Sequence, residues 1–356
     1  MENKKNKEDR YLEVVFKLLY LIIALMIFLG LFVYINVAGV PDMLKPSEEL
    51  IYENAKDTIK QKDEVKSPAT AGRDLWQAPD TLDIVKEPNA EQIFYGRSLI
   101  KNTSLYLGPN GTVAHSSNGM NCQNCHLDAG TKAFGNNYSG VASTYPKFRE
   151  RSGAMENIYK RVNDCFERSL NGKALDTLGK EMQAIKAYVV WLGKDVKKGE
   201  KPKGGGLVEL KYLDRAADVD KGQIVYVAKC LSCHGTKGEG KMNADNLAYQ
   251  YPPLWGEHSY NDGAGLYRLS RFAGYVKVNM PLGAKHNNPQ LTDEECWDVA
   301  AFVNSQVRPK KDLSKDWPKI AGKPVDYPFG PYADKFSAHR SPSGCRIWSD
   351  PRWSRQ

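Results

Sequence analysis

Two copies of one short motif constrain this chain more than any other feature. They are CQNCH at 122–126 and CLSCH at 230–234, and both follow the pattern C-x-x-C-H. In this pattern two thiols can bond to the vinyl groups of a haem, and the adjoining histidine then lies under the iron as an axial ligand. Zinc is the main alternative for paired cysteines, but a zinc site does not require a histidine directly after the second cysteine. We therefore predict two covalently attached haem c groups, held by Cys122, Cys125, His126, Cys230, Cys233 and His234.

The sequence around the two motifs repeats one order of elements. A helical pattern with an interior glycine precedes each motif, with Gly96 inside 91–102 and Gly222 ahead of the second motif. A helix bearing aromatic residues follows, at 178–192 in the first half and after the capping box at 292–295 in the second. Because an interior glycine costs about 1 kcal/mol relative to alanine, each one indicates a close helix crossing. This order resembles class I cytochrome c domains, so we predict a mostly α fold with two such domains in tandem.

An apolar stretch at 18–40 precedes both domains, and it is long enough to cross a bilayer. We predict a transmembrane helix there, with the N-terminus inside, because Lys and Arg are more frequent before the stretch than just after it. Covalent haem is attached outside the cytoplasmic membrane, so we expect a single-pass protein with its haem domains on the periplasmic side. The alternative is a signal peptide cleaved near Val37-Ala38-Gly39, which would leave a soluble periplasmic protein.

Composition and net charge indicate where the domains begin and end and what kind of partner the protein binds. Net charge is +8, which suits an anionic substrate or an acidic partner, and we see no nucleic-acid-binding motif. The predicted parts are a cytoplasmic N-terminus (1–17), the anchor (18–40), a polar tether (41–80), a first cytochrome c domain (81–193), a basic glycine-rich linker (194–206), a second cytochrome c domain (207–308), and an extended C-terminal arm with an irregular tail (309–356).

The second haem needs another axial ligand from the loop between its motif and the last helix. That loop contains Met280-Pro281, and a methionine before proline is the usual cytochrome c arrangement. His/Met ligation raises the haem potential. His258 and His286 are competing ligands without this context, and Met280 could instead be a core residue, since a thioether also fills gaps.

The equivalent loop of the first domain offers Cys165, with Met155 as the other sulfur. A cysteine would ligate as thiolate and lower the haem potential. The alternatives are a structural cysteine or a disulfide with Cys296 or Cys345. Several cations surround Cys165 in sequence: Lys147, Arg149, Arg151, Lys160, Arg161 and Arg168. Arginine suits oxyanions such as sulfonates, although a solvated basic helix is the alternative interpretation.

From about residue 90 to 308 the chain resembles the dihaem thiosulfate dehydrogenases, also called tetrathionate reductases. The resemblance lies in the segments at 121–130 (NCQNCHLDAG), 145–151 (YPKFRER), 161–172 (RVNDCFERSLNG), 230–235 and 279–281 (NMP). It implies an active-site haem ligated by His126 and Cys165, with substrate bound by Arg151 and Arg161. Some members carry a lysine that exchanges with the following methionine, but Asn279 stands there in this chain, so a haem ligated by His234 and Met280 is predicted.

The resemblance implies an oxidoreductase that interconverts thiosulfate and tetrathionate, exchanging two electrons with a partner such as another cytochrome c. Two haems can hold one electron each, and cations suit a dianionic substrate. Two alternatives remain at this point. One is a membrane-anchored dihaem electron carrier with no substrate of its own, which gives no reason for Cys165. The other is a SoxAX-like sulfur-oxidising cytochrome, which also uses a cysteine-ligated haem but requires a carrier protein.

Overall fold

The computed structural model describes residues 16–27, 29, 30 and 75–333 of the chain. The chain divides into two compact units, Met1–Asp63 and Glu64–Gln356. In the first unit the described residues are helical and their side chains are exposed. No helix within the described ranges is long and apolar enough to cross a membrane. The rest of the predicted anchor, at 28 and 31–40, lies outside the described residues, as does most of the tether.

The first helical domain is built around the crossing of α3 (Ala90–Lys101) and α8 (Lys180–Leu192). Gly96 makes this crossing possible, because a Cβ at that position would lie 1.9 Å from the Ala184 carbonyl oxygen. The predicted apolar stripe of α8 is buried in this contact. Both predicted helices are therefore confirmed, and so is the role of the glycine.

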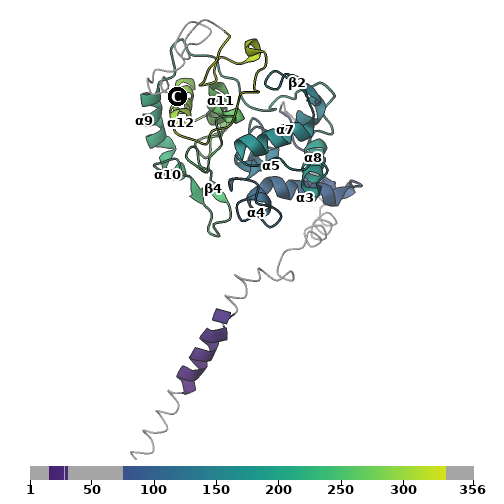
Figure 1. The fold of residues 1–356 in the computed structure, drawn as a ribbon, viewed down its shortest axis with the longest axis vertical. Coiled ribbons are helices and arrows are strands. Elements are labelled where there is room, and N and C mark those ends of the chain that lie inside the picture. Colours follow the sequence, from purple (N-terminus) through teal and green to yellow (C-terminus); the bar gives the residue numbers. More distant parts are fainter. Residues whose placement is uncertain (1–15, 28, 31–74, 334–356) are drawn as a thin grey trace, which may run out of the picture. The chain divides into compact units, whose positions relative to one another are not determined.

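The second helical domain repeats the crossing with α9 (Val219–Lys229) and α12 (Asp293–Ser305). A Cβ on Gly222 would lie 2.0 Å from the Asp298 carbonyl oxygen. The predicted capping box is present, since the Glu295 amide donates to Thr292 Oγ1 at 3.1 Å and the Thr292 amide donates to the Glu295 carboxylate at 2.8 Å. Helix α11 (Leu269–Asn279) packs on α12. Figure 1 shows α9, α11 and α12 together on one side and α3, α7 and α8 together on the other.

Short elements connect these helices and shape the loops around the two motifs. The remaining α-helical turns are α4 (Thr103–Leu107), α5 (Leu127–Gly130), α6 (Val141–Thr144), α7 (Ile158–Asp164) and α10 (Leu231–His234). The 3-10 helices are Thr81–Lys86, Cys122–Asn124, Gly265–Tyr267 and Ile320–Gly322, and a π-helical turn runs over Cys165–Ser169. Within residues 75–333 two antiparallel hairpins are present, β1 (Lys147–Arg149) with β2 (Ala154–Glu156), and β3 (Lys241–Met242) with β4 (Tyr249–Tyr251).

The C-terminal arm, described here for residues 309–333, turns back onto the first domain. The Trp317 amide donates to the Arg151 carbonyl oxygen at 2.7 Å, and Asp316 accepts two hydrogen bonds from Arg168, both at 2.8 Å. The rings of Trp317 and Tyr327 pack edge to face, with centroids 4.7 Å apart. The rest of the predicted arm and tail, at 334–356 with Cys345, lies outside the described residues.

Candidate haem centres and active site

A cavity of about 770 Å³ lies beside the second motif. Cys230, Cys233, His234 and Met280 all line it. Its apolar lining comes mainly from Leu254, Leu266, Phe272, Val276, Val299 and Val303. A large apolar cavity with a few convergent polar groups is the usual form of a cofactor site. Two thiols, an imidazole and a thioether around such a cavity fit a haem c.

His234 is oriented for metal binding. Its Nδ1 lies 2.8 Å from the Pro252 carbonyl oxygen, and because a carbonyl can only accept, Nδ1 carries the proton. Nε2 is then the atom left to bind a metal. Burial lowers the pKa of His234, which favours the neutral imidazole that a metal ligand must be. The competing ligands His258 and His286 do not appear in the lining of this cavity as described.

His126 of the first motif is held in the same way. Its Nδ1 lies 2.5 Å from the Asn136 carbonyl oxygen, and its ring stacks on Tyr138 with centroids 4.5 Å apart. Burial lowers the pKa of His126 to about 4, an effect that the Asn136 carbonyl partly opposes. Asp128 and Ala129, which follow one residue later, have φ near +55°, so the chain makes a left-handed turn here and α5 is not a regular helix. The thiols of this motif and the free Nε2 of His126 again fit a haem c.

Cys165 lies where α7 passes into the π-helical turn, a local widening that is frequent at functional sites. Arg161 Nη1 donates to Cys165 Sγ at 3.2 Å. The Cys165 sulfur is the main cause of the raised pKa of Arg161. It also adds to the effect of burial in raising the pKa of Cys122 and of Cys125 to about 12. These effects require short distances, so the fold brings Cys165 to the first motif.

The position of Cys165 bears on the two alternatives to it, ligation by Met155 and a disulfide with Cys296 or Cys345. Met155, the other sulfur of this loop, is 63% exposed on β2. Cys165 and Cys296 both carry free thiols, and Cys296 is buried in α12. A disulfide between these two is therefore absent from the described residues, and Cys345 lies outside them.

Arg151 contacts the arm and a loop of the second domain rather than a free surface. Its guanidinium donates to the Gly263 carbonyl oxygen at 2.7 Å and to the Tyr327 hydroxyl at 2.5 Å. Asp316 lies 3.6 Å from its Nε, and the Trp317 ring lies 4.8 Å from its Cζ. Burial lowers the pKa of Arg151. The structure thus places Arg161 against Cys165 and Arg151 against the arm.

The remaining cations of the predicted cluster have separate surroundings. Lys160 pairs with Asp164 at 2.5 Å, and Arg168 is buried against Asp316 and Asp164. Arg149 lies 3.9 Å from Glu156. Lys147 is exposed on β1. Half of the cluster, Arg151, Arg161 and Arg168, is therefore in buried or partly buried contacts, unlike the solvated basic helix of the alternative interpretation.

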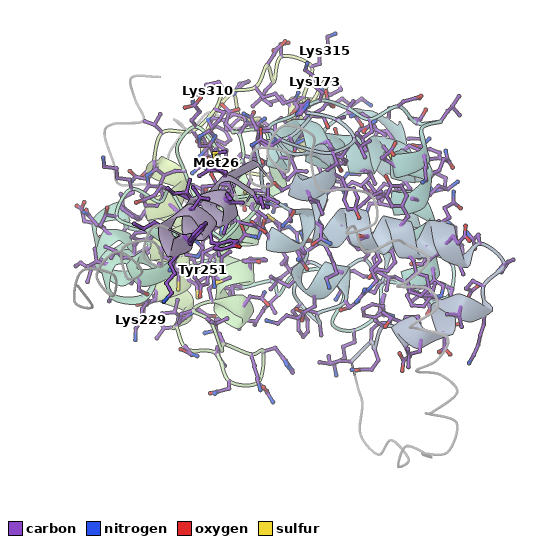
Figure 2. The ribbon with its side chains drawn as sticks, turned by 90° about the horizontal axis from the view of Figure 1, so that it is seen from below. Met26, Lys173, Lys229, Tyr251, Lys310 and Lys315 are labelled. Carbon is purple, nitrogen blue, oxygen red and sulfur yellow. The ribbon has the colours of Figure 1, made fainter. Side chains whose placement is uncertain are left out.

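Sequence reasoning missed the partners that the arm and the loops provide. Asp316 and Tyr327 contact arginines of the first domain, but the sequence of the arm indicated only an extended segment. The arm also carries exposed cations, and Figure 2 shows Lys310 and Lys315 toward the same edge of the molecule as Lys173. The carbonyls of Asn136 and Pro252, which orient the two histidines, have no sequence signature because any residue provides one.

Each of the two helical domains matches a known protein family. Residues 112–197 match the family described as "SoxA/TsdA, cytochrome c domain", and residues 219–306 match the family described as "Cytochrome c". These matches cover the two motifs and the helices that follow them. The fold therefore consists of two tandem cytochrome c domains.

Individual proteins also resemble the chain. A thiosulfate dehydrogenase of Psychrobacter arcticus is 36% identical over 250 residues, which is 70% of this chain and 73% of that protein. One of Allochromatium vinosum is 40% identical over 223 residues, or 62% of this chain and 79% of that protein. Among solved structures, thiosulfate dehydrogenase (TsdBA) from Marichromatium purpuratum, in its "as isolated" form, is 30% identical with a TM-score of 0.61. The match covers 67% of this chain and 50% of that one.

The motifs and the family matches agree on the cofactor. Each cytochrome c domain contains one C-x-x-C-H motif with an oriented histidine, and the match to the Psychrobacter arcticus protein covers 70% of this chain. The chain therefore binds two covalently attached haem c groups, as predicted.

Proposed function

Because this chain belongs to the thiosulfate dehydrogenase family, a family of oxidoreductases with cytochrome c domains, we propose that it interconverts thiosulfate and tetrathionate. Two thiosulfate ions would be joined into one tetrathionate with the release of two electrons, or the reverse. The observation that carries the proposal is the contact of Arg161 with Cys165 beside the first motif. A cation and a sulfur nucleophile in one half-buried site suit a dianion that reacts through sulfur.

The residues of the site can be given separate tasks. Arg161 binds a sulfonate oxygen and also holds the Cys165 thiolate. The guanidinium of Arg151, the other arginine predicted to bind substrate, contacts Gly263, Tyr327 and Asp316, so a sulfonate would have to share it with these partners. The Cys165 thiolate bonds to the outer sulfur of one thiosulfate with loss of two electrons, which gives a Cys–S–S–SO₃⁻ link. The second thiosulfate then displaces the thiolate and leaves as tetrathionate, so that atoms and charge balance without a proton. Each haem, when bound, accepts one of the two electrons.

We assign the ligands of the two haems from the same contacts. His126 and Cys165 would hold the first haem, and His234 and Met280 would hold the second. The oriented imidazoles, the cavity lining and the contact of Arg161 with Cys165 support this assignment. The thiolate adds negative charge and lowers the potential of the first haem, whereas a thioether ligand favours a higher potential at the second. Electrons from thiosulfate would therefore move from the first domain to the second and then to an external cytochrome c.

A SoxA-like role is the second candidate, because the matched family includes both SoxA and TsdA. The two roles differ in substrate, since SoxA-like chemistry acts on sulfur attached to a carrier protein. A protein that turns over free thiosulfate needs no such carrier. A plain dihaem electron carrier is less favoured, because it leaves the contact between Arg161 and Cys165 without a use.

We also propose that the apolar stretch at 18–40 anchors the chain in the cytoplasmic membrane, with the haem domains on the periplasmic side. The proposal is supported by the length and apolar composition of the stretch. Membrane fractionation of cells that express the full chain tests it. The haem protein should stay with the membranes after a salt wash, and its appearance in the soluble periplasmic fraction would favour the cleaved signal peptide instead.

The main experiment compares purified wild type with Cys165→Ala, using free thiosulfate in one direction and tetrathionate in the other. Wild type should turn over both, and Cys165→Ala should lose both conversions. Its mass should still show two haems, because Cys122, Cys125, Cys230 and Cys233 are unchanged. Cys296→Ala is the matched control, since that thiol is buried in α12. Normal turnover by Cys165→Ala would leave the electron carrier as the better account.

A further inference from the structure

Helix α11 contacts the regions of both haem motifs. Its residues Phe272, Tyr275 and Val276 line the cavity of the second motif, and Met280 follows its last residue. Cys125 of the first motif lines the same cavity. One wall of the second haem site is therefore also the boundary of the first.

Two side chains of α11 donate hydrogen bonds across this boundary. The Tyr275 hydroxyl donates to the Asn124 carbonyl oxygen at 3.0 Å, and Asn279 Nδ2 donates to the Phe134 carbonyl oxygen at 3.1 Å. Tyr275 and Asn279 are one helical turn apart, so they share a face of α11, and they are only 6% and 3% exposed. Because both side chains are buried, these hydrogen bonds lie in surroundings of low dielectric constant, which strengthens them.

Both accepting carbonyls belong to segments that hold the first haem. Asn124 lies between the two cysteines of the first motif. Phe134 lies two residues before Asn136, whose carbonyl oxygen orients His126. The amides of Phe134 and Asn136 donate to the carbonyl oxygens of Gly204 and Gly206, at 2.8 and 3.0 Å. The segment at 134–136 is therefore fixed from both sides, and a displacement of α11 would reach His126 through two residues of backbone.

The amide of Asn279 is oriented by its surroundings. Nδ2 also donates to the Tyr275 carbonyl oxygen at 3.0 Å, and two carbonyl acceptors identify that end of the amide as the nitrogen. Its Oδ1 is buried without a hydrogen-bond partner among the described residues. A buried carbonyl that makes no hydrogen bond does not favour stability. Asparagine at this position is therefore better explained by the contact it makes with the first domain than by the stability of the second.

We propose that Tyr275 and Asn279 are positioning residues that fix the two haem sites relative to each other and couple the Met280 side of one to the His126 loop of the other. The proposal rests on the proposed function only in using the electron route from the first domain to the second. It concerns residues of α11 that take no part in binding thiosulfate. The two hydrogen bonds keep constant the distance over which an electron moves between the two haem sites.

The test uses the full-length protein with both haems and no sulfur compound. One readout is the rate at which the haems share an electron after flash photoreduction of the oxidised protein. The other is hydrogen exchange at 122–138. The variants are Tyr275→Phe, which keeps the ring, and Asn279→Leu, which keeps the approximate size. Lys277→Gln is the matched control, because Lys277 is on the same helix but contacts Asp293 and the Leu291 carbonyl within the second domain.

We expect slower electron sharing in both variants and about fivefold faster hydrogen exchange at 122–138, the effect of losing one net hydrogen bond. Asn279→Leu should change the unfolding temperature little, since it also removes a buried oxygen without a partner among the described residues. A purely structural role would instead lower that temperature and leave electron sharing as in the control. Rates and exchange equal to those of Lys277→Gln overturn the proposal, and if Asn279→Leu does not fold, Tyr275→Phe alone decides. If wild type does not turn over thiosulfate, the proposed function is refuted, whereas the electron-sharing and hydrogen-exchange results for the α11 variants still stand.

Discussion

Removal of the Arg161 side chain has an effect whose size can be worked out from one contact. Arg161 Nη1 donates to Cys165 Sγ at 3.2 Å, and the same guanidinium is proposed to bind a sulfonate. A hydrogen bond to a charged group contributes about 1.5–3 kcal/mol, and 1.36 kcal/mol corresponds to a factor of ten in rate. Arg161→Ala should therefore lower kcat/KM for thiosulfate by about 10- to 150-fold.

The assay is steady-state thiosulfate oxidation with an excess of an artificial electron acceptor. Lys160→Ala is the matched control, because it removes one positive charge from the neighbouring residue of α7, where the side chain is 47% exposed and paired with Asp164. Surface ion pairs contribute little, so the control should stay within a few-fold of wild type. Arg161→Lys should fall between the two, since lysine keeps the charge but not the planar fork. Equal losses in Arg161→Ala and Lys160→Ala would show that only net charge matters and would refute the local contact.

Three further outcomes follow from the fold and the motifs. Mass spectrometry of the mature protein should show two haem additions, and a mass with one or none would contradict the two motifs. Met280→Gly should change the spectrum and potential of one haem only; if neither haem responds, His258 or His286 becomes the candidate ligand. Gly222→Ala should destabilise the protein by about 1–3 kcal/mol in thermal unfolding, because its Cβ would lie 2.0 Å from a backbone oxygen. Ile224→Ala on the same helix, 70% exposed, is the control and should unfold near wild type.

The parts of the molecule that follow from local sequence could be predicted. The haem motifs have a fixed spacing because the two cysteines and the histidine bond to one rigid group. The helices have a fixed period, and the glycine inside each first helix indicated the crossing that Gly96 and Gly222 make. Cys165 was chosen because a haem needs a second ligand and few residues in its loop offer one, and its ligation of the first haem stays a prediction.

The parts that depend on distant pairs could not be predicted. Arg168 and Asp316 are separated by 148 residues, and no periodic pattern connects them. The hydrogen bond from Tyr275 to Asn124 spans 151 residues and ends on a backbone carbonyl, which every residue has. The left-handed turn at Asp128 and Ala129 was also missed, because neither position is a glycine. The sequence showed which cations lie near Cys165 along the chain, but not which of them would contact the arm.

The carboxylate of Asp316 makes the first cytochrome domain depend on a segment that follows the second. It belongs to the arm that follows the second domain, yet it pairs with Arg168 at 2.8 Å and lies 3.6 Å from Arg151, both in the first. If one partner of a buried ion pair is removed, the charge that remains costs about 3–5 kcal/mol. A first domain expressed alone, or a chain cut at Arg308, would lose this carboxylate. Gene fusions and rearrangements in such a protein should therefore preserve the arm together with the first domain, although the sequence places it at the opposite end.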